Sequence, residues 1–321
     1  MELAVVIVTW NVRELALDAL HTLQADVTAH GPDTQIWVVD NASVDHMAEA
    51  VRENYPDVNL IASPDNLGFG AGNNLALTEM GFGQDVPIDD LPRAVFLLNP
   101  DTLVHTRAVL TLYEALFAAP DVGMVGARLT YEDGSFQHSA FGFPGVWQTA
   151  IDLLPVPSRL PGRLAGRLYG SGLNGRYASA LYEGSRPFPV DHVLGATMML
   201  RREVIQQTGM FDEQFFMYCE EVDWAMRIRQ AGWQILCVPQ AHITHLEGKS
   251  TAQIRSESTL NLWRSRFQLY EKHYAPLKLA TIRQVVRLGM RRKIIQARQD
   301  SALSADQQAA LIEAYQAVAQ L

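Results

Sequence analysis

The chain has little cysteine and no long apolar segment. Cys219 and Cys237 are its two cysteines, and their spacing matches no paired zinc motif. A disulfide framework is therefore excluded, as is typical of proteins in the reducing cytoplasm. No apolar run approaches the roughly 18 to 20 residues that span a bilayer. Met1 to Trp10 lacks the basic start and the cleavage site of a signal peptide, so we interpret it as a strand.

Positive charge is also in deficit. The 26 Lys and Arg residues face 35 Asp and Glu residues, which gives a formal net charge of -9. An acidic chain repels a phosphate backbone, so this balance argues against nucleic-acid binding. A small anionic ligand is still compatible with it where a metal ion or a helix N-terminus supplies local positive charge. Hydrophobic residues make up 48% of the chain, which is enough for a sizeable core.

The N-terminal half alternates short apolar runs with helical patterns. Apolar runs of this length are typical of strands that are covered on both faces, and the alternation predicts an α/β fold with a mainly parallel sheet. We also expect Asn11 to cap the first helix, and Ser43 or Asp45 to start the second. The predicted strands are Leu3–Thr9, Gln35–Val39, Leu60–Ala62 and Ala94–Leu98.

The second half is less regular. The segment from Phe141 to Pro189 is rich in Gly, Pro, Arg and Tyr, and its prolines, including Pro155, Pro157 and Pro161, exclude a long helix. Long irregular segments in compact domains are usually functional or mobile, so we expect this one to border an acceptor site. Beyond it, the patterns predict a strand at Val193–Leu200, helices at Arg202–Thr208 and Phe215–Gln230, a strand at Gln234–Val238 and helices after Ser250.

Two acidic residues follow predicted strands. Asp40 ends the second strand, and Asp101 comes shortly after Ala94–Leu98. Ligands of open parallel sheets sit beyond the carboxyl ends of the strands, where carboxylates suit ribose hydroxyls and hard cations. Each aspartate alone is as readily explained as a helix cap. Both together favour a nucleotide site.

A glycine-rich segment spans residues 66–74 and opens a predicted helix from about Asn73 to Met80. Such segments let backbone N–H groups approach phosphate. Its glycines, however, are spaced G-x-G-x-G and do not match the dinucleotide fingerprint. Taken alone, the segment is better explained as a tight turn.

The densest group of acids is Glu220, Glu221 and Asp223, flanked by aromatic residues. Mutual repulsion and apolar surroundings raise the pKa of at least one carboxyl, as a general base requires. The alternative is a negatively charged first helical turn that favours the helix dipole. His242 and His245 follow the next predicted strand, and a histidine near a carboxylate suits a divalent metal site.

Taken together, these stretches resemble the family 2 glycosyltransferases with the GT-A fold, and most strongly their rhamnosyltransferase-type members. The order and spacing of the motifs agree from about Leu3 to Ser250. Each motif alone is weak, whereas seven in order are highly specific. The matching stretches are residues 6–11, 38–45, 66–74, 97–101, 195–200, 209–213 and 216–224, followed by Gly232-Trp233 and His245.

The resemblance implies a role for each motif. Asp101, in Asn99-Pro100-Asp101, would coordinate Mg²⁺ or Mn²⁺ on the donor diphosphate, with His245 as a further ligand. Glu220-Glu221 would match the acidic pair whose second member is the base, which leaves both glutamates as candidates. Asp223 and Trp224 would lie on the acceptor side. The residues implied for the nucleotide are Thr9, Asn11, Asp40, Asn41, Asn66, Gly68, Asn73 and Asn99.

The implied activity is an inverting transfer of a rhamnose-type or other hexose from a nucleotide-diphosphate sugar to a glycan or lipid-linked acceptor. A nucleotidyltransferase is an alternative, but Arg52, Arg93 and Arg128 all lie outside the glycine-rich segment that would hold a triphosphate. A non-catalytic carbohydrate-binding or scaffold protein is a second alternative. It is disfavoured because Asp101 and both glutamates are present.

The C-terminal stretch, residues 251–321, is predicted to be a helical extension of a catalytic domain at residues 1–250. Apolar residues from Leu279 to Met290 alternate with basic residues from Arg283 to Lys293. One interpretation is a packed helix with a solvated basic face. The other is peripheral attachment of a cytoplasmic protein to the inner face of the cell membrane. The final stretch, Ala302 to Leu321, is compatible with a partner helix or a homodimer.

Overall fold

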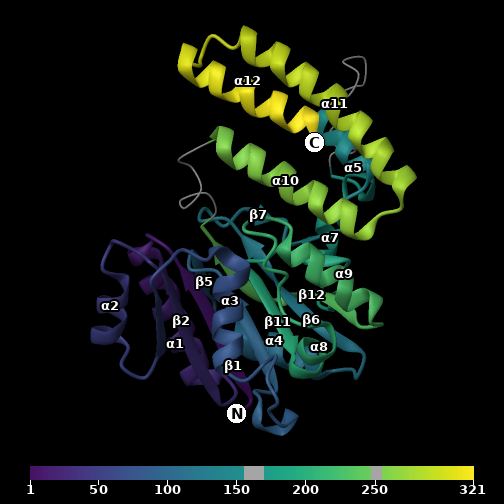
Figure 1. Ribbon diagram of the computed structural model, residues 1–321. Coiled ribbons are helices and arrows are strands. Elements are labelled where there is room, and N and C mark those ends of the chain that lie inside the picture. Colours follow the sequence, from purple (N-terminus) through teal and green to yellow (C-terminus); the bar gives the residue numbers. More distant parts are fainter. Residues whose placement is uncertain (155–169, 247–254) are drawn as a thin grey trace. The chain divides into compact units, whose positions relative to one another are not determined.

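The computed structural model describes residues 1–154, 170–246 and 255–321. It contains two compact units (Figure 1). The first, called the sheet unit, comprises Met1–Phe141, Ser179–Phe216 and Glu220–Ser250. The second, called the helical unit, comprises Gly142–Ala178, Met217–Cys219 and Thr251–Leu321.

The sheet unit is built on one large mixed sheet. Within the described ranges the order of its main strands is β3-β2-β1-β4-β11-β6-β12-β5. The strands β3, β2, β1 and β4 are parallel, as are β6 and β12, whereas β11 runs antiparallel between β4 and β6. The strands are β1 Leu3–Thr9, β2 Thr34–Asn41, β3 Asn59–Ser63, β4 Ala94–Leu98, β5 Thr102–Val104, β6 Val122–Thr130, β11 Thr197–Arg201 and β12 Gln234–His245, with short strands β7 Phe136–Gln137 and β9 Phe188–Pro189 at its margin and β8 Ala140–Phe141 paired with β10 His192–Val193 beside it.

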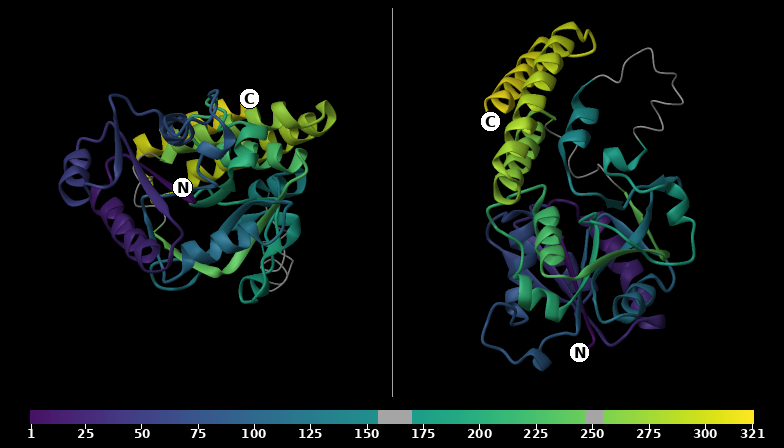
Figure 2. Two further views of the ribbon diagram at one scale, coloured as in Figure 1. Left: turned by 90° about the horizontal axis from the view of Figure 1, so that it is seen from below. Right: turned by 90° about the vertical axis from the view of Figure 1, so that its right-hand side faces the viewer.

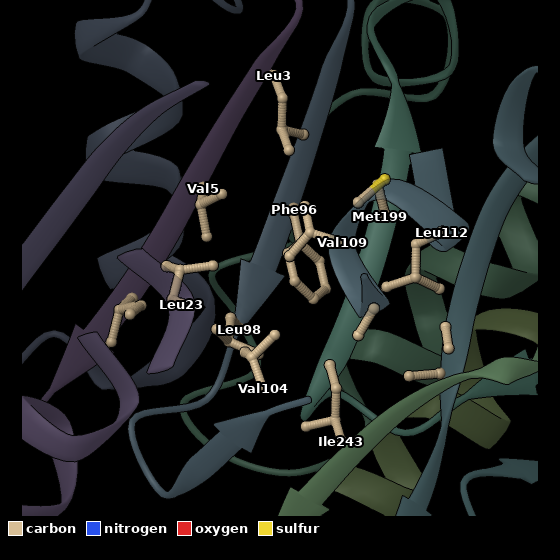
Figure 3. Packing of buried hydrophobic residues seen from close by; sticks show 14 of the residues in the cluster. Leu3, Val5, Leu23, Phe96, Leu98, Val104, Val109, Leu112, Met199 and Ile243 are labelled. Atoms are coloured by element: carbon tan, nitrogen blue, oxygen red, sulfur yellow. The ribbon is translucent and has the colours of Figure 1, made fainter. Parts of the chain in front are cut away.

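Helices flank this sheet on both faces. The core forms where Val5 of β1 and Phe96 of β4 pack with Leu23 of α1 and Leu112 of α4 (Figure 3). On the opposite face α3 lies close to β1, since a Cβ on Gly72 would stand 2.8 Å from Cγ1 of Val8. The helices are α1 Arg13–His30, α2 Met47–Asn54, α3 Gly68–Glu79, α4 Ala108–Phe117, α7 Ser179–Tyr182, α8 Arg202–Thr208 and α9 Glu220–Gln230, with a 3-10 turn, η1, at Ile88–Asp90.

The predicted fold class is confirmed, and several elements match residue for residue. Leu3–Thr9 and Ala94–Leu98 are strands, and Arg202–Thr208 is a helix. All residues of both strands are buried, as their continuous apolar composition predicts.

Other boundaries differ from the prediction. Helix α3 begins at Gly68, not at Asn73, and α9 begins at Glu220, not at Phe215. Strand β12 continues past Val238 to His245, with a register shift in between. The glycine-rich segment is therefore the first turn of a helix, and His245 lies on a strand.

The predicted caps are also corrected. Asn11 does not cap α1; its Oδ1 accepts a hydrogen bond from the backbone N–H of Val44 at 2.8 Å. Asp45 does not start α2, whose N-cap is His46. Oδ2 of Asp45 instead accepts a hydrogen bond from the first N–H of α1, that of Arg13, at 2.8 Å. These bonds tie the segment after β2 to the segment after β1.

The helical unit consists of α5 Val146–Leu153, the 3-10 turn η2 Gly172–Asn174, and the long helices α10 Arg255–His273, α11 Pro276–Gln299 and α12 Ala305–Gln320. Helices α11 and α12 run side by side (Figure 2). Gly289 allows α11 to approach α5, because a Cβ there would stand 2.5 Å from the Cβ of Leu153. None of the helices in the described ranges combines the length and the apolar character needed to cross a bilayer.

Part of the segment predicted to be irregular is ordered as helix α5. This helix groups with the C-terminal helices, since Gly142–Ala178 belongs to the helical unit. Pro155, Pro157 and Pro161 lie outside the described residues. That the segment borders an acceptor site stays a prediction.

Candidate active site

Polar side chains gather where β1, β2 and β4 end. Thr9 is the last residue of β1 and pairs in register with Asp40 of β2, and Asn99 directly follows β4. Three buried oxygen atoms here have no hydrogen-bond partner in the described structure: Oγ1 of Thr9, Oδ1 of Asn41 and Oδ1 of Asn99. Buried polar atoms are rarely left unpaired in folded proteins. Their presence at the carboxyl edge of a sheet is typical of a site that a ligand completes.

Asp40 closes a turn of the backbone and keeps further capacity to accept hydrogen bonds. Its Oδ1 accepts a hydrogen bond from the backbone N–H of Ser43 at 3.1 Å, which closes the turn after β2. The turn requires a left-handed residue, Ala42, with φ of 59°. A carboxylate has lone pairs beyond those used by one N–H donor, so Asp40 retains acceptor capacity for ribose hydroxyls.

The start of α3 is tied to the end of β2. The side-chain amide of Asn41 donates to the backbone oxygen of Gly68 at 2.9 Å, and Oδ1 of Asn66 accepts from the N–H of Gly68 at 3.0 Å. Gly68 has φ of 81°, and a Cβ there would stand 2.4 Å from the backbone oxygen of Phe216. Three predicted residues thus meet at one helix start. Asn73 differs, because its amide donates back to the backbone oxygen of Phe69 within α3.

Asp101 and His245 form a buried pair. Asp101 lies in the turn between β4 and β5, and His245 pairs in register with Thr102 of β5. Nε2 of His245 lies 3.3 Å from Oδ1 of Asp101, and the two residues are 6% and 5% exposed. The backbone N–H of Leu246 donates to the backbone oxygen of Asp101 at 2.8 Å, which fixes the strand end beside the turn.

The pair suits a divalent cation. A carboxylate and an imidazole are ordinary ligands of Mn²⁺ and related ions, and Nδ1 of His245 is buried without a partner. Among the described residues no group of three or more His, Cys, Asp or Glu is placed to hold a metal ion, so further ligands would come from the bound substrate or water. His242 does not join this pair; its ring stacks on that of His105, with centroids 4.8 Å apart.

Glu220 and Glu221 open helix α9. Tyr218 and Cys219 before them have left-handed φ angles of 69° and 68°, which turn the chain and delay the helix. Glu220 is 5% exposed, and its Oε2 has no hydrogen-bond partner among the residues that the structure describes. Burial, and then the charge of Glu221, raise the pKa of Glu220 well above its ordinary value. Burial also raises the pKa of Glu221.

Two glycines border these carboxylates. A Cβ on Gly70 would stand 3.8 Å from the Cβ of Glu220, and a Cβ on Gly195 would stand 3.8 Å from the Cβ of Glu221. The first turn of α3 and the segment before β11 therefore face the start of α9. Motifs that are more than 100 residues apart in the sequence therefore lie close together here, and their catalytic role stays a prediction.

Asp223 and Trp224, for which the resemblance implied the acceptor side, lie inside the sheet unit, and their acceptor role stays a prediction. Both are fully buried, with 0% exposure, so neither offers a surface to a ligand. Oδ2 of Asp223 accepts from Nε of Arg227 at 2.9 Å, and Arg227 also donates to the backbone oxygens of Thr208 and Met210. The indole N–H of Trp224 donates to Oγ1 of Thr208 at 3.0 Å. These residues hold the segment after α8 in place.

Asn74 is a residue that the sequence patterns did not single out for a separate role. Its Oδ1 accepts from the N–H of Phe211 at 3.0 Å, and its Nδ2 donates to the backbone oxygen of Phe211 and to Glu213, both at 2.9 Å. It therefore fastens α3 to the segment that Arg227 holds from the other side. The available signal was a second asparagine on the buried face of a helix.

Known proteins resemble this chain in sequence and in fold. It is 29% identical over 221 residues to the N-acetylglucosaminyl-diphospho-decaprenol L-rhamnosyltransferase of Mycobacterium tuberculosis (strain CDC 1551 / Oshkosh), covering 68% of each chain. It superposes on GalNAc-T7 in complex with UDP, GalNAc and Mn²⁺ with a TM-score of 0.57 at 16% identity, covering 84% of this chain and 48% of that one.

A second solved structure matches nearly the whole chain. The mannosyltransferase PcManGT of Pyrobaculum calidifontis, in complex with GDP-Man and Mn²⁺, has a TM-score of 0.55 at 16% identity, covering 99% of this chain and 86% of that one. Both structural neighbours have the GT-A fold that the strand order displays. The sequence model described as glycosyltransferase like family 2 matches residues 2–259, so the chain belongs to this family of glycosyltransferases.

Proposed function

We propose that this protein transfers a rhamnose-type or other hexose from a nucleotide-diphosphate sugar to a hydroxyl group of a glycan or lipid-linked acceptor, with inversion at the anomeric carbon. The observation that carries the proposal is the group of buried, unpartnered polar atoms on Thr9, Asn41, Asn99, His245 and Glu220. They come from separate elements that meet at the carboxyl edge of the sheet. The name of the mycobacterial relative supports rhamnose and a lipid-linked acceptor as the first choices.

The donor nucleotide occupies the ends of β1 and β2. Thr9 contacts the base, and Asp40 accepts hydrogen bonds from the ribose hydroxyls with the acceptor capacity that Ser43 leaves free. Asn66 accepts from the first N–H of α3, that of Gly68, and the N-cap residue Leu67 makes no side-chain cap bond, so the N–H groups after Gly68 and the helix dipole favour the diphosphate. Asn41 and Asn66 keep this helix start in position through Gly68.

Asp101 and His245 would hold a divalent ion, Mg²⁺ or Mn²⁺, for the donor diphosphate. Bound there, it would neutralise charge on the departing diphosphate. Asp101 supplies the carboxylate, and the buried Nδ1 or Nε2 of His245 supplies the nitrogen ligand. The presence of Mn²⁺ in two solved GT-A neighbours supports this assignment.

Glu221 is the proposed base, with Glu220 as the second candidate. The acceptor oxygen attacks the anomeric carbon, the bond from that carbon to the diphosphate breaks, and the carboxylate takes the hydroxyl proton. A raised carboxyl pKa makes Glu221 a stronger base than a solvated glutamate. Glu221 keeps part of its surface exposed, whereas Glu220 is buried, which favours Glu221 as the base.

Donor binding with and without metal tests the proposal. Titration calorimetry of the full chain with UDP, dTDP and GDP should show binding at least roughly tenfold tighter in Mn²⁺ than in EDTA for one of them, because the ion bridges protein and diphosphate. His245→Ala should remove this dependence. His242→Ala is the matched control, since it deletes a histidine of the same strand outside the pair.

Equal affinity with and without Mn²⁺ would contradict the metal assignment. A parallel assay with a panel of nucleotide sugars reports slow donor hydrolysis and identifies the sugar. Absence of both binding and hydrolysis across the panel would contradict the donor class itself.

A further inference from the structure

Helix α11 differs in charge from the rest of the chain. Its 24 residues, Pro276–Gln299, include no Asp or Glu, although the chain as a whole carries 35. The helix has seven basic residues, which makes it a strongly cationic element in a protein with a net charge of -9. They are Lys278, Arg283, Arg287, Arg291, Arg292, Lys293 and Arg298.

One face of α11 is packed within the helical unit. Ile282, Val286, Met290 and Ala297 are buried. The opposite face carries three large apolar side chains that are open to solvent, Leu277 at 82% exposure, Leu288 at 54% and Ile295 at 55%. At 3.6 residues per turn these three positions fall within about 20° of one another and form a ridge roughly 27 Å long.

Arginines flank this ridge. Arg287, Arg291 and Arg298 are exposed beside it, and none of them has a hydrogen-bond or ion-pair partner among the described residues. By contrast, Arg283 pairs with Glu271 at 2.5 Å, and Arg292 reaches the backbone oxygen of Leu153 at 3.4 Å. The outer face of α11 is defined by the ridge Leu277, Leu288 and Ile295 together with Arg287, Arg291 and Arg298.

We propose that the outer face of α11 binds the surface of an anionic lipid bilayer. Apolar side chains in a line enter the boundary between head groups and acyl chains when the helix lies in the plane of the surface. The flanking arginines then meet lipid phosphates, for which a guanidinium is a bidentate partner. This attachment does not rest on the proposed glycosyl transfer, and it holds without donor or metal.

Charge decides between a membrane and other occupants. In a contact with a second copy of α11, the arginines would face no carboxylate, because the helix has none, and an antiparallel pair would place arginine beside arginine. A nucleic-acid backbone offers phosphates but no apolar layer for Leu277, Leu288 and Ile295. An anionic bilayer supplies both phosphates for the arginines and an apolar layer for the ridge.

Vesicle sedimentation tests the proposal. At low salt, the full chain should sediment with phosphatidylcholine vesicles that contain 30% phosphatidylglycerol, and much less with vesicles of phosphatidylcholine alone. Added salt should weaken binding to the anionic vesicles, because it screens the attraction. Replacing Arg287, Arg291 and Arg298 together by Gln should weaken binding about 100-fold, since each basic residue near such a surface contributes about fivefold. Replacing Leu277, Leu288 and Ile295 together by Ser should weaken it by a similar factor.

The matched control replaces Arg52, Arg186 and Arg264, which are exposed elsewhere, by Gln, and it should bind nearly as well as the wild type. All substituted side chains are at least partly exposed, and equal melting temperatures confirm that each variant is folded. Equal loss in control and test variants, or equal binding to neutral and anionic vesicles, would overturn the proposal. A wild-type protein that binds neither vesicle and forms dimers would also overturn it if the Ser variant is monomeric, since a second copy would then occupy the face.

Discussion

Two groups of buried polar side chains lie close together in the sheet unit and differ in how they are satisfied. In the first group, Asn74, Trp224 and Arg227 direct their polar atoms at the segment from Thr208 to Glu213. In the second group, Thr9, Asn41, Asn99, His245 and Glu220 each keep a buried polar atom without a partner. Helix α9 contributes to both groups, with Trp224 and Arg227 in the first and Glu220 in the second.

The difference separates scaffold from site. A buried polar atom without a partner costs roughly 1 to 3 kcal/mol, so several of them at one edge of a sheet favour a site that a ligand, an ion or water completes. In the first group the named polar atoms have partners, and their hydrogen bonds hold the backbone of the segment from Thr208 to Glu213 in place. Substitutions in the two groups should therefore have opposite signatures, one in activity and the other in stability.

The largest effect is expected for the acidic pair. Glu221→Gln should lower the transfer rate about 1000-fold while leaving the affinity for the donor nearly unchanged, because only proton removal is lost. Steady-state transfer with a saturating donor, together with calorimetry of the nucleoside diphosphate, separates the two quantities.

Glu220→Gln is the matched comparison for this prediction. If Glu220→Gln is inactive and Glu221→Gln is active, the base is one residue earlier in the chain. Two active variants would rule out a carboxylate base at the start of α9 and would leave the site without its proposed chemistry.

A smaller effect, of the opposite kind, is expected for Asn74. Asn74→Ala leaves the N–H of Phe211 without its acceptor in a buried position, so it should lower the free energy of unfolding by about 2 kcal/mol. Urea unfolding measures the loss. Asn54→Ala is the control, because Asn54 is exposed and bonds only within α2, and it should stay within about 0.5 kcal/mol of the wild type. A wild-type stability for Asn74→Ala would remove the distinction between scaffold and site.

The sequence predicted several strands well because they depend on local pattern. The runs Leu3–Thr9 and Ala94–Leu98 are apolar throughout, and a strand buried on both faces has that composition. The resemblance then assigned Asp101 and His245 to one metal site, and the structure places their side chains 3.3 Å apart. Their role as ligands stays a proposal.

Elements that depend on tertiary contacts were less predictable. Glycines disfavour a helix, yet α3 begins at Gly68 because Gly70 and Gly72 let it approach Phe211 and Val8 closely. The predicted strand ended at Val238, whereas β12 passes Pro239 through an irregularity and continues to His245. The sequence alone does not distinguish an aspartate at a helix start that faces a ligand from one that is buried in an ion pair with an arginine, as Asp223 is with Arg227.

The last and smallest effect concerns pH and again contrasts the two groups. The folded protein holds a proton on Glu220 more strongly than the unfolded chain does, since burial and Glu221 raise its pKa above the ordinary value of 4.5. Between these two pKa values the unfolded state binds fewer protons, so stability falls as pH rises from about 4.5 through the folded pKa, and is level beyond it. Glu220→Gln lacks this loss, so its stability relative to the wild type should increase between pH 4 and pH 8. Carboxylates away from this pair titrate alike in both proteins and cancel in the difference, whereas Glu221 also loses the repulsion of its neighbour in the variant, which changes the difference in the same direction. Urea unfolding at several pH values, without metal or nucleotide, measures this difference in stability.

Glu49→Gln, at an exposed site on α2, is the control and should give a curve parallel to that of the wild type. A parallel curve for Glu220→Gln as well would show that Glu220 is solvated in the folded protein and belongs to neither group.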